Sequence, residues 1–275
     1  MRTLVWLEAT VGDPALDDLW SFLASYVDGL AAGRVRTRLV HAGTDAGGIR
    51  TPANRLLSDA VVLAKAVEQD AGADALVIGC WGAPTPAVRA AVSAAVTGLG
   101  EASVRAASTL GRRAAVVTVA ESLAPVFSDE IRDLGGAHTF LGQPVRAYAP
   151  ESTHLDVVRA VEDPTDLIER FDVTARRAVD DGADAVVVGC GYLGAIFAVH
   201  GYTAVGGAPD VPVIDPNRLA LEHVLQLRLL ADAGMGPTPR GYVRPTGARR
   251  DALLTTTRRL IDVSPALPTQ EGTPR

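Results

Sequence analysis

The stretch "GADALVIGC" at residues 72–80 returns as "GADAVVVGC" at residues 182–190. The two phrases agree at seven of nine positions, and each difference replaces one aliphatic residue by another. Both end in a cysteine, and Cys80 and Cys190 are the only cysteines of the chain. A short, continuous apolar run of this kind is typical of a strand that is buried on both faces. The repeat therefore predicts two pseudo-symmetric lobes, each with a buried strand that ends beside a cysteine.

Segments with strand and helix character alternate on both sides of the two phrases. We expect strands at 3–9, 35–42, 74–80, 95–99, 112–120, 144–150, 184–190 and 211–216. We expect helices at 14–30, 54–69, 84–95, 101–110, 121–136, 166–181, 217–230 and 251–263, with a loop at 234–249. Strands that alternate with helices over the whole chain predict an α/β fold in which parallel sheets are flanked by helices.

The composition of the 275 residues is that of a globular protein, with 48% hydrophobic and 21% charged residues. The net charge is -6 and like charges form no long runs, which argues against a nucleic-acid or anionic-membrane partner. The first residues lack the long apolar segment of a signal peptide, and no apolar run is long enough to cross a bilayer. We expect a cytoplasmic protein whose thiols stay reduced and whose partner is a small-molecule substrate.

The position of the cysteines points to chemistry on a carbon acid. Parallel sheets bind ligands outside the carboxyl ends of their strands, where Cys80 and Cys190 would face one cleft. Gly82 and Gly191 would let backbone amides approach a ligand, and a helix that begins after each cysteine would lower the pKa of the thiol. One thiolate could remove a proton next to a carbonyl while the other thiol returned one to the opposite face, without a cofactor. Backbone amides near Trp81, Gly82 and Gly191 would stabilise the enolate.

Other roles for the cysteines have to be weighed. Free cysteine is often a small apolar residue of the core, including at strand ends. A disulfide between Cys80 and Cys190 would require their α-carbons to lie within about 7 Å. A structural zinc site needs four ligands, whereas the chain has two cysteines, and His200 follows Cys190 without a metal-binding spacing. We therefore expect no metal.

Several longer segments carry a resemblance to a known family. They are "GADALVIGCWG", "VTGLGEASVRAA" from Val96, "AAVVTVAESLAPVFSDEIRDLGG", and "GADAVVVGCGYLG" followed by "VPVIDP". In order and spacing they resemble the aspartate/glutamate racemase superfamily, and within it the hydantoin racemases. The resemblance implies two flavodoxin-like lobes with the active site between them, and Cys80 and Cys190 as the paired bases.

We expect the first lobe to comprise residues 1–97 and 216–263, the second 98–215, and residues 264–275 to form a flexible tail. Helical lobes with an acidic surface are compatible with a homo-oligomer, which we also expect.

The resemblance places further residues near the cleft. Glu101 and Ser103 of "GLGEAS" and Thr118 of "VVTV" match positions that lie there in the family. An acid stabilised by the helix dipole is the alternative for Glu101, and a helix cap is the alternative for Thr118. Trp81 and Tyr192 would give the cleft an aromatic wall, unless they pack inside their own helices.

The chain departs from the family mainly where the substrate is recognised. Many hydantoin racemases carry Asn-Pro-Asn-Thr after the first strand, where this chain has "LEAT" at residues 7–10. Amino-acid racemases of the superfamily follow their cysteines with Asn-Thr and Thr-His, where this chain has Trp81-Gly82 and Gly191-Tyr192. These aromatic residues suggest a 5-substituted hydantoin or a related cyclic amide or imide as the substrate. An amino-acid racemase, a maleate isomerase-like or arylmalonate decarboxylase-like enzyme, and a non-catalytic two-lobed binding protein remain alternatives.

Overall fold

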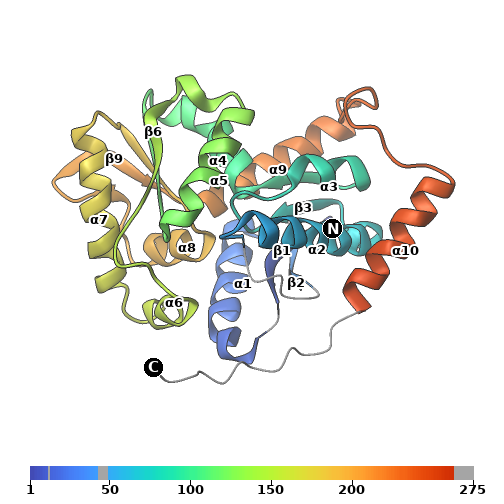
Figure 1. Ribbon diagram of the computed structural model, residues 1–275, viewed down its shortest axis with the longest axis horizontal. Coiled ribbons are helices and arrows are strands. Elements are labelled where there is room, and N and C mark those ends of the chain that lie inside the picture. The colour runs from blue at the N-terminus through green and yellow to red at the C-terminus, as the bar shows by residue number, and fades with distance from the viewer. Residues whose placement is uncertain (12, 43–48, 263–275) are drawn as a thin grey trace.

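The structure is a computed structural model that describes residues 1–11, 13–42 and 49–262 (Figure 1). Two sheets lie side by side, each with helices packed on it, and form two lobes. The first sheet has the strand order β2-β1-β3-β4, with β1 at Thr3–Val11, β2 at Arg36–Ala42, β3 at Ala75–Ile78 and β4 at Ala95–Gly98. The second sheet has the order β6-β5-β7-β9-β8, with β5 at Ala114–Thr118, β6 at Phe140–Ala147, β7 at Ala185–Val188, β8 at Ala204–Val205 and β9 at Ala208–Ile214. Neighbouring strands are parallel, as predicted, except that β8 runs antiparallel to β9.

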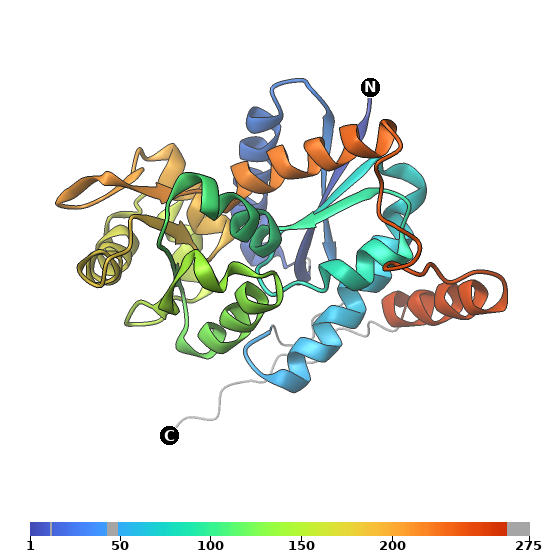
Figure 2. The ribbon, with the colours of Figure 1, turned by 90° about the horizontal axis from the view of Figure 1, so that it is seen from above.

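Helices cover both faces of the first sheet (Figure 2). Helices α1 (Asp17–Ala31) and α9 (Pro216–Asp232) lie on one face, and α2 (Pro52–Gln69) and α3 (Thr85–Ala91) lie on the other. The remaining helices are α4 (Leu99–Leu110), α5 (Ala124–Asp133), α6 (His154–Ala160), α7 (Thr165–Asp180), α8 (Gly191–Val199) and α10 (Ala248–Asp262). Of these, α7 packs on β5, β7 and β9 of the second sheet, α5 packs on β6, and α10 packs on α2.

The strands that precede the cysteines are apolar because both of their faces are covered. In the first sheet, Leu4, Trp6 and Val77 belong to the hydrophobic cluster that includes α1, whereas Leu7 and Ile78 belong to the cluster formed with α2 and α3. Alternate side chains of a strand point to opposite faces, so a strand covered on both sides needs apolar residues at every position. The continuous apolar runs of the repeated phrase follow from this packing.

The aspartate of each repeated phrase joins the start of its strand to the neighbouring strand through hydrogen bonds. The Asp74 carboxylate accepts a hydrogen bond from the backbone N–H of Thr3 at 2.8 Å, and the Asp74 N–H donates to the Thr3 carbonyl at 2.9 Å. In the second sheet the Asp184 carboxylate accepts from the N–H groups of Arg112 and Arg113, and the Asp184 N–H donates to the Arg113 carbonyl. These bonds fix the same register between β1 and β3 as between β5 and β7.

Some local features differ from the sequence prediction. Helix α3 ends at Ala91, earlier than expected, because the Asp70 carboxylate accepts hydrogen bonds from the backbone N–H and the hydroxyl of Ser93 and turns the chain into β4. Helix α6 and strand β8 were not predicted. Helix α6 begins at a capping box in which Thr153 and Asp156 exchange side-chain and backbone hydrogen bonds.

After α9 the chain runs through the predicted loop to α10 (Figure 1). The predicted tail at residues 264–275 lies outside the described residues. Within the described ranges, no helix combines the length and the apolar character that crossing a bilayer requires.

The contribution of the Asp184 hydrogen bonds to stability can be tested by removing the carboxylate. Asp184→Ala removes the carboxylate that accepts from two exposed backbone N–H groups, and we expect the free energy of unfolding to fall by about 0.5–1.5 kcal/mol. Urea unfolding followed by circular dichroism measures the loss. Asp210 is an exposed aspartate on β9, and Asp210→Ala should change stability by less than about 0.5 kcal/mol. Equal losses of stability in Asp184→Ala and Asp210→Ala would show that the Asp184 hydrogen bonds do not stabilise the fold.

Candidate active site

Cys80 and Cys190 occupy equivalent positions at the carboxyl ends of two strands. The Gly79 N–H donates to the Leu7 carbonyl at 2.8 Å, and the Gly189 N–H donates to the Val117 carbonyl at 2.8 Å. Each glycine therefore extends the pairing of its strand by one residue, and the cysteine follows directly. Both cysteines carry free thiols, and each residue as a whole is partly exposed to solvent. The predicted placement of the cysteines at strand ends agrees with this arrangement.

The two strand ends approach each other across the boundary between the lobes. A Cβ atom added to Gly191, the residue after Cys190, would lie 3.4 Å from the Gly79 carbonyl oxygen and 2.9 Å from Leu99 Cδ1. The start of α8 therefore lies against the backbone next to Cys80. In addition, the negative charge of a Cys190 thiolate would raise the pKa of Cys80, so the two sulfurs are within electrostatic range of each other.

The expected lowering of the thiol pKa values is wrong for this structure. Burial raises the pKa of Cys190 to about 11, although the backbone N–H groups of Leu193 and Tyr192 at the start of α8 act in the opposite direction. Burial also raises the pKa of Cys80, whose Sγ donates to the Trp81 carbonyl at 3.2 Å. The helix N-terminus does favour the Cys190 thiolate, but loss of water around the sulfur outweighs it. Neighbouring negative charge, including that of Glu8, raises both pKa values further.

Glu8, in the second half of β1, is a buried carboxyl group whose charge acts on both thiols. It is 3% exposed, and Trp6 Nε1 donates to its Oε1 at 2.8 Å while the Tyr192 hydroxyl donates to the carboxyl group. Burial raises the pKa of Glu8 to about 7. A Cβ atom at Gly79 would overlap Glu8 Oε1, so the carboxyl group lies directly over the backbone that leads into Cys80.

Sequence reasoning missed Glu8 as a site residue. The 110-residue offset that relates Cys80 to Cys190 also relates Leu7 to Val117, and hence Glu8 to Thr118. Applying that offset to Thr118, which the family resemblance had placed at the cleft, would have found Glu8.

Glu130 connects the second lobe to the loop after Cys80. Its Oε2 accepts a hydrogen bond from the Gly82 N–H at 2.8 Å, and Gly82 has a φ of 69°, which favours glycine. A Cβ atom at Gly100 would overlap the Glu130 carboxyl group, so a second glycine makes room for this contact. Burial raises the pKa of Glu130 to about 7. The Cys80 loop is thus held by a group of the opposite lobe.

The aromatic residues that were expected to line the cleft are both buried. Trp81 is 1% exposed and its ring lies 5.3 Å from that of Phe127. Within the described part of the chain, its indole N–H lacks a hydrogen-bond partner. The Tyr192 hydroxyl accepts from Trp20 Nε1 at 3.3 Å and lies 3.4 Å from Thr10 Oγ1. Tyr192 thereby connects α8 of one lobe to α1 and β1 of the other.

The remaining predicted residues, Glu101, Ser103 and Thr118, are buried in the protein interior. Ser103 and Thr118 are fully buried, and the Thr118 hydroxyl donates to the Gly189 carbonyl at 3.5 Å. The Glu101 carboxylate forms an ion pair with Arg89 and accepts from the Thr97 hydroxyl at 3.4 Å. The structure therefore brings Gly191 and Tyr192 to the thiols and directs the Glu101 carboxylate toward α3 instead.

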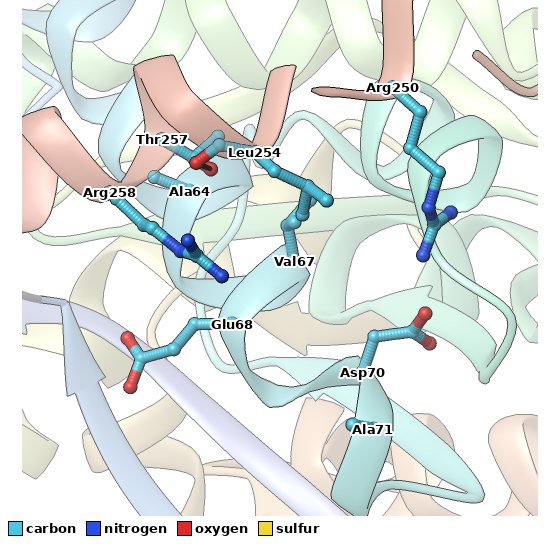
Figure 3. Close-up of a pocket in the computed structure, with 9 residues that line it drawn as sticks. All are labelled: Ala64, Val67, Glu68, Asp70, Ala71, Arg250, Leu254, Thr257 and Arg258. Atoms are coloured by element: carbon cyan, nitrogen blue, oxygen red, sulfur yellow. Dashed lines mark hydrogen bonds between the residues drawn. The ribbon is translucent and has the colours of Figure 1, made fainter. Parts of the chain in front are cut away.

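A cavity of about 500 Å³ lies elsewhere, between α2 and α10 (Figure 3). Figure 3 shows Arg250 extending toward Asp70 and Arg258 toward Glu68. None of the residues that line this cavity is a predicted site residue. Among the described residues, no three His, Cys, Asp or Glu side chains are grouped as metal ligands would be.

The family described as Asp/Glu/Hydantoin racemase matches residues 23–224. The chain belongs to this family. It is 34% identical over 149 residues to a hydantoin racemase of Pseudomonas sp. (strain NS671), a match that covers 54% of this chain and 55% of that protein. It is 29% identical over 154 residues to a hydantoin racemase of Rhizobium meliloti, covering 52% and 56%. The chain thus matches about half the length of these curated relatives.

Solved structures of two racemases have the same fold. The allantoin racemase from Klebsiella pneumoniae is 21% identical, with a TM-score of 0.71 over 90% of this chain and 95% of that one. The allantoin racemase from Pseudomonas fluorescens is 20% identical, with a TM-score of 0.72 over 90% and 98%. The predicted family and the predicted α/β fold of two lobes are confirmed.

The raised thiol pKa values can be tested by alkylation. Because both thiols are neutral at pH 7, we expect iodoacetamide to react slowly with the native protein and faster as the pH rises. Cys80→Ser and Cys190→Ser each leave one thiol to follow, and urea-unfolded protein gives the rate of an ordinary thiol. Glu8→Gln removes a charge that raises both pKa values, and should speed alkylation at a given pH. A native rate that levels off below the ordinary thiol pKa of about 8.5 would contradict the assignment.

Proposed function

We propose that this protein is a cofactor-independent racemase in which Cys80 and Cys190 form the acid/base pair. The substrate is a compound with an acidic carbon next to a carbonyl group, namely a 5-substituted hydantoin or a related cyclic amide. The observation that carries the proposal is that two free thiols follow equivalent strands of the two lobes and that the backbones beside them approach each other. The names of the hydantoin racemases among the relatives support the substrate class.

The reaction needs the two sulfurs on opposite faces of one carbon. The thiolate of one cysteine takes the proton from the carbon, the C–H bond breaks, and its electron pair moves toward the carbonyl oxygen as an enolate. The thiol of the other cysteine then gives its proton to the opposite face, and the carbonyl is restored with inverted configuration. The pair ends with its charge on the other sulfur, so the reverse reaction uses the same groups in exchanged roles.

The raised pKa values suit this chemistry. A hydrogen at a carbon next to a carbonyl is a weak acid, and a thiolate whose pKa has been raised is a stronger base. Burial raises the pKa of Cys190 to about 11, so its thiolate is a minor form at neutral pH. The rate of a reaction that begins with a thiolate should therefore rise with pH on the alkaline side of neutrality.

The decisive experiment follows one enantiomer of 5-benzylhydantoin in D2O. For the wild-type protein we expect the circular dichroism signal to decay and deuterium to appear at C5 by NMR, both faster than in a blank without protein. Cys80→Ser and Cys190→Ser should each lose racemisation by a factor of about 10²–10⁴, the range for removal of one acid/base group. Far-UV circular dichroism checks that both variants are folded.

The outcomes separate the alternatives. Wild-type protein that neither racemises nor exchanges the hydantoin would refute the assignment and favour the isomerase, decarboxylase or binding-protein interpretations. Racemisation that survives in either single variant would refute the two-thiol mechanism. A variant that exchanges deuterium into one enantiomer only would identify which cysteine serves which face.

A further inference from the structure

Among the described residues, the buried carboxyl group of Glu8 raises the pKa of both thiols, and the proposed reaction leaves it without a role. We propose that the Glu8 carboxylate selects the substrate: it accepts a hydrogen bond from an N–H group of a neutral amide and repels ligands that carry a carboxylate. This inference rests on the proposed function, since it concerns the ligand held between Cys80 and Cys190. It makes Glu8 a specificity-determining residue of that site.

The position of Glu8 is the first support. Its carboxyl group lies over the Gly79 backbone, in space that a Cβ atom at Gly79 would occupy. Trp6 Nε1 holds it from its own strand, and the Tyr192 hydroxyl holds it from the start of α8. The carboxyl group is therefore fixed at the point where the two lobes bring their cysteines together.

The hydrogen-bonding capacity of the group is the second support. An ionised carboxylate accepts about four hydrogen bonds. Trp6 and Tyr192 are the donors that the described residues supply to Glu8. The carboxylate thus retains acceptor capacity, which an amide N–H of a ligand can use.

The electrostatics of the site are the third support. The charged groups that raise the pKa of Cys80 are the other thiolate and three carboxylates, those of Glu8, Glu130 and Asp59. Another carboxylate placed between the sulfurs would meet negative charge at low dielectric. A neutral ligand that donates a hydrogen bond would instead stabilise Glu8.

The experiment compares two ligands that share one side chain. 5-Benzylhydantoin is neutral and has ring N–H groups, and N-carbamoylphenylalanine, its ring-opened form, carries a carboxylate. Binding is measured by calorimetry at pH 7.5 with wild type, Glu8→Gln and Asp172→Asn. Asp172 is a suitable control because it is a buried carboxylate that accepts from a tyrosine hydroxyl, Tyr202, and it lies in α7 rather than beside a cysteine.

We expect wild type to prefer the hydantoin at least tenfold. Glu8→Gln keeps an oxygen that can accept from Trp6 but loses the charge, so it should bind the carboxylate ligand at least tenfold more tightly than wild type does. Asp172→Asn should leave the preference unchanged. A preference that is the same in wild type and Glu8→Gln would overturn the proposal.

A pH series on the wild-type protein tests the same idea without a variant. Burial raises the pKa of Glu8 to about 7, so the group is protonated at pH 5.5 and the preference for the hydantoin should shrink there. The groups that face Glu8 are Trp6, Tyr192 and the two thiols, and the raised pKa values of the tyrosine and thiols keep these neutral over this range. Glu130 and Asp59 do titrate nearby, so the dependence must flatten in Glu8→Gln.

The two proposals fail in different ways. Discrimination between the ligands without racemisation would support the role of Glu8 and refute the racemase. Racemisation with an unchanged preference in Glu8→Gln would refute the role of Glu8 alone. Wild-type protein that binds neither ligand would refute both.

Discussion

The glycine before each cysteine is the constraint on which the site depends. Gly79 and Gly189 each donate to the end of the neighbouring strand, and each lies under a side chain of that strand. A Cβ atom at Gly79 would overlap the Glu8 carboxyl group, and one at Gly189 would lie 3.0 Å from the Cβ of Thr118. Any larger residue would separate the strands at the point where they deliver the thiols. The Gly-Cys pair of the repeated phrase is therefore a packing requirement as well as a chemical one.

The two halves of the chain share more than the repeated phrase, but they carry different residues at the candidate site. Asp74 and Asp184 make corresponding backbone contacts, which keeps both strand pairs in the same register. At the strand ends the symmetry breaks, because Glu8 stands where the other half has Thr118, and Trp81 stands where it has Gly191. A duplicated framework with unlike residues at its centre suits a site in which two similar groups act on the two faces of an asymmetric ligand.

The repeated phrase and the alternation of strand and helix segments were sufficient to predict the parallel sheets and the positions of both cysteines at strand ends, since these depend on local periodicity and spacing. The family was predicted from the longer segments that resemble it. The direction of the thiol pKa shift was not predictable, because it depends on how far the assembled fold buries the sulfurs of Cys80 and Cys190. The ion pair of Glu101 with Arg89 and the contact of Glu130 with Gly82 also join segments that only the tertiary fold brings together. Sequence patterns specify strands and helices, whereas burial and charge at a site arise from their assembly.

Charge on two carboxyl groups of the candidate site opposes folding, in contrast to the charge of Asp172. Asp172 is also buried, yet hydrogen bonds from Tyr202 and the Gly206 N–H and the nearby Arg176 outweigh burial and lower its pKa. Glu8 and Glu130 lack comparable compensation, and burial raises the pKa of each from 4.5 to about 7. Between these values the folded protein binds more protons than the unfolded chain, so both groups reduce stability as the pH rises through this window. Incompletely satisfied carboxyl groups at the junction of the lobes are what a site would need if its ligand is to complete the hydrogen bonding.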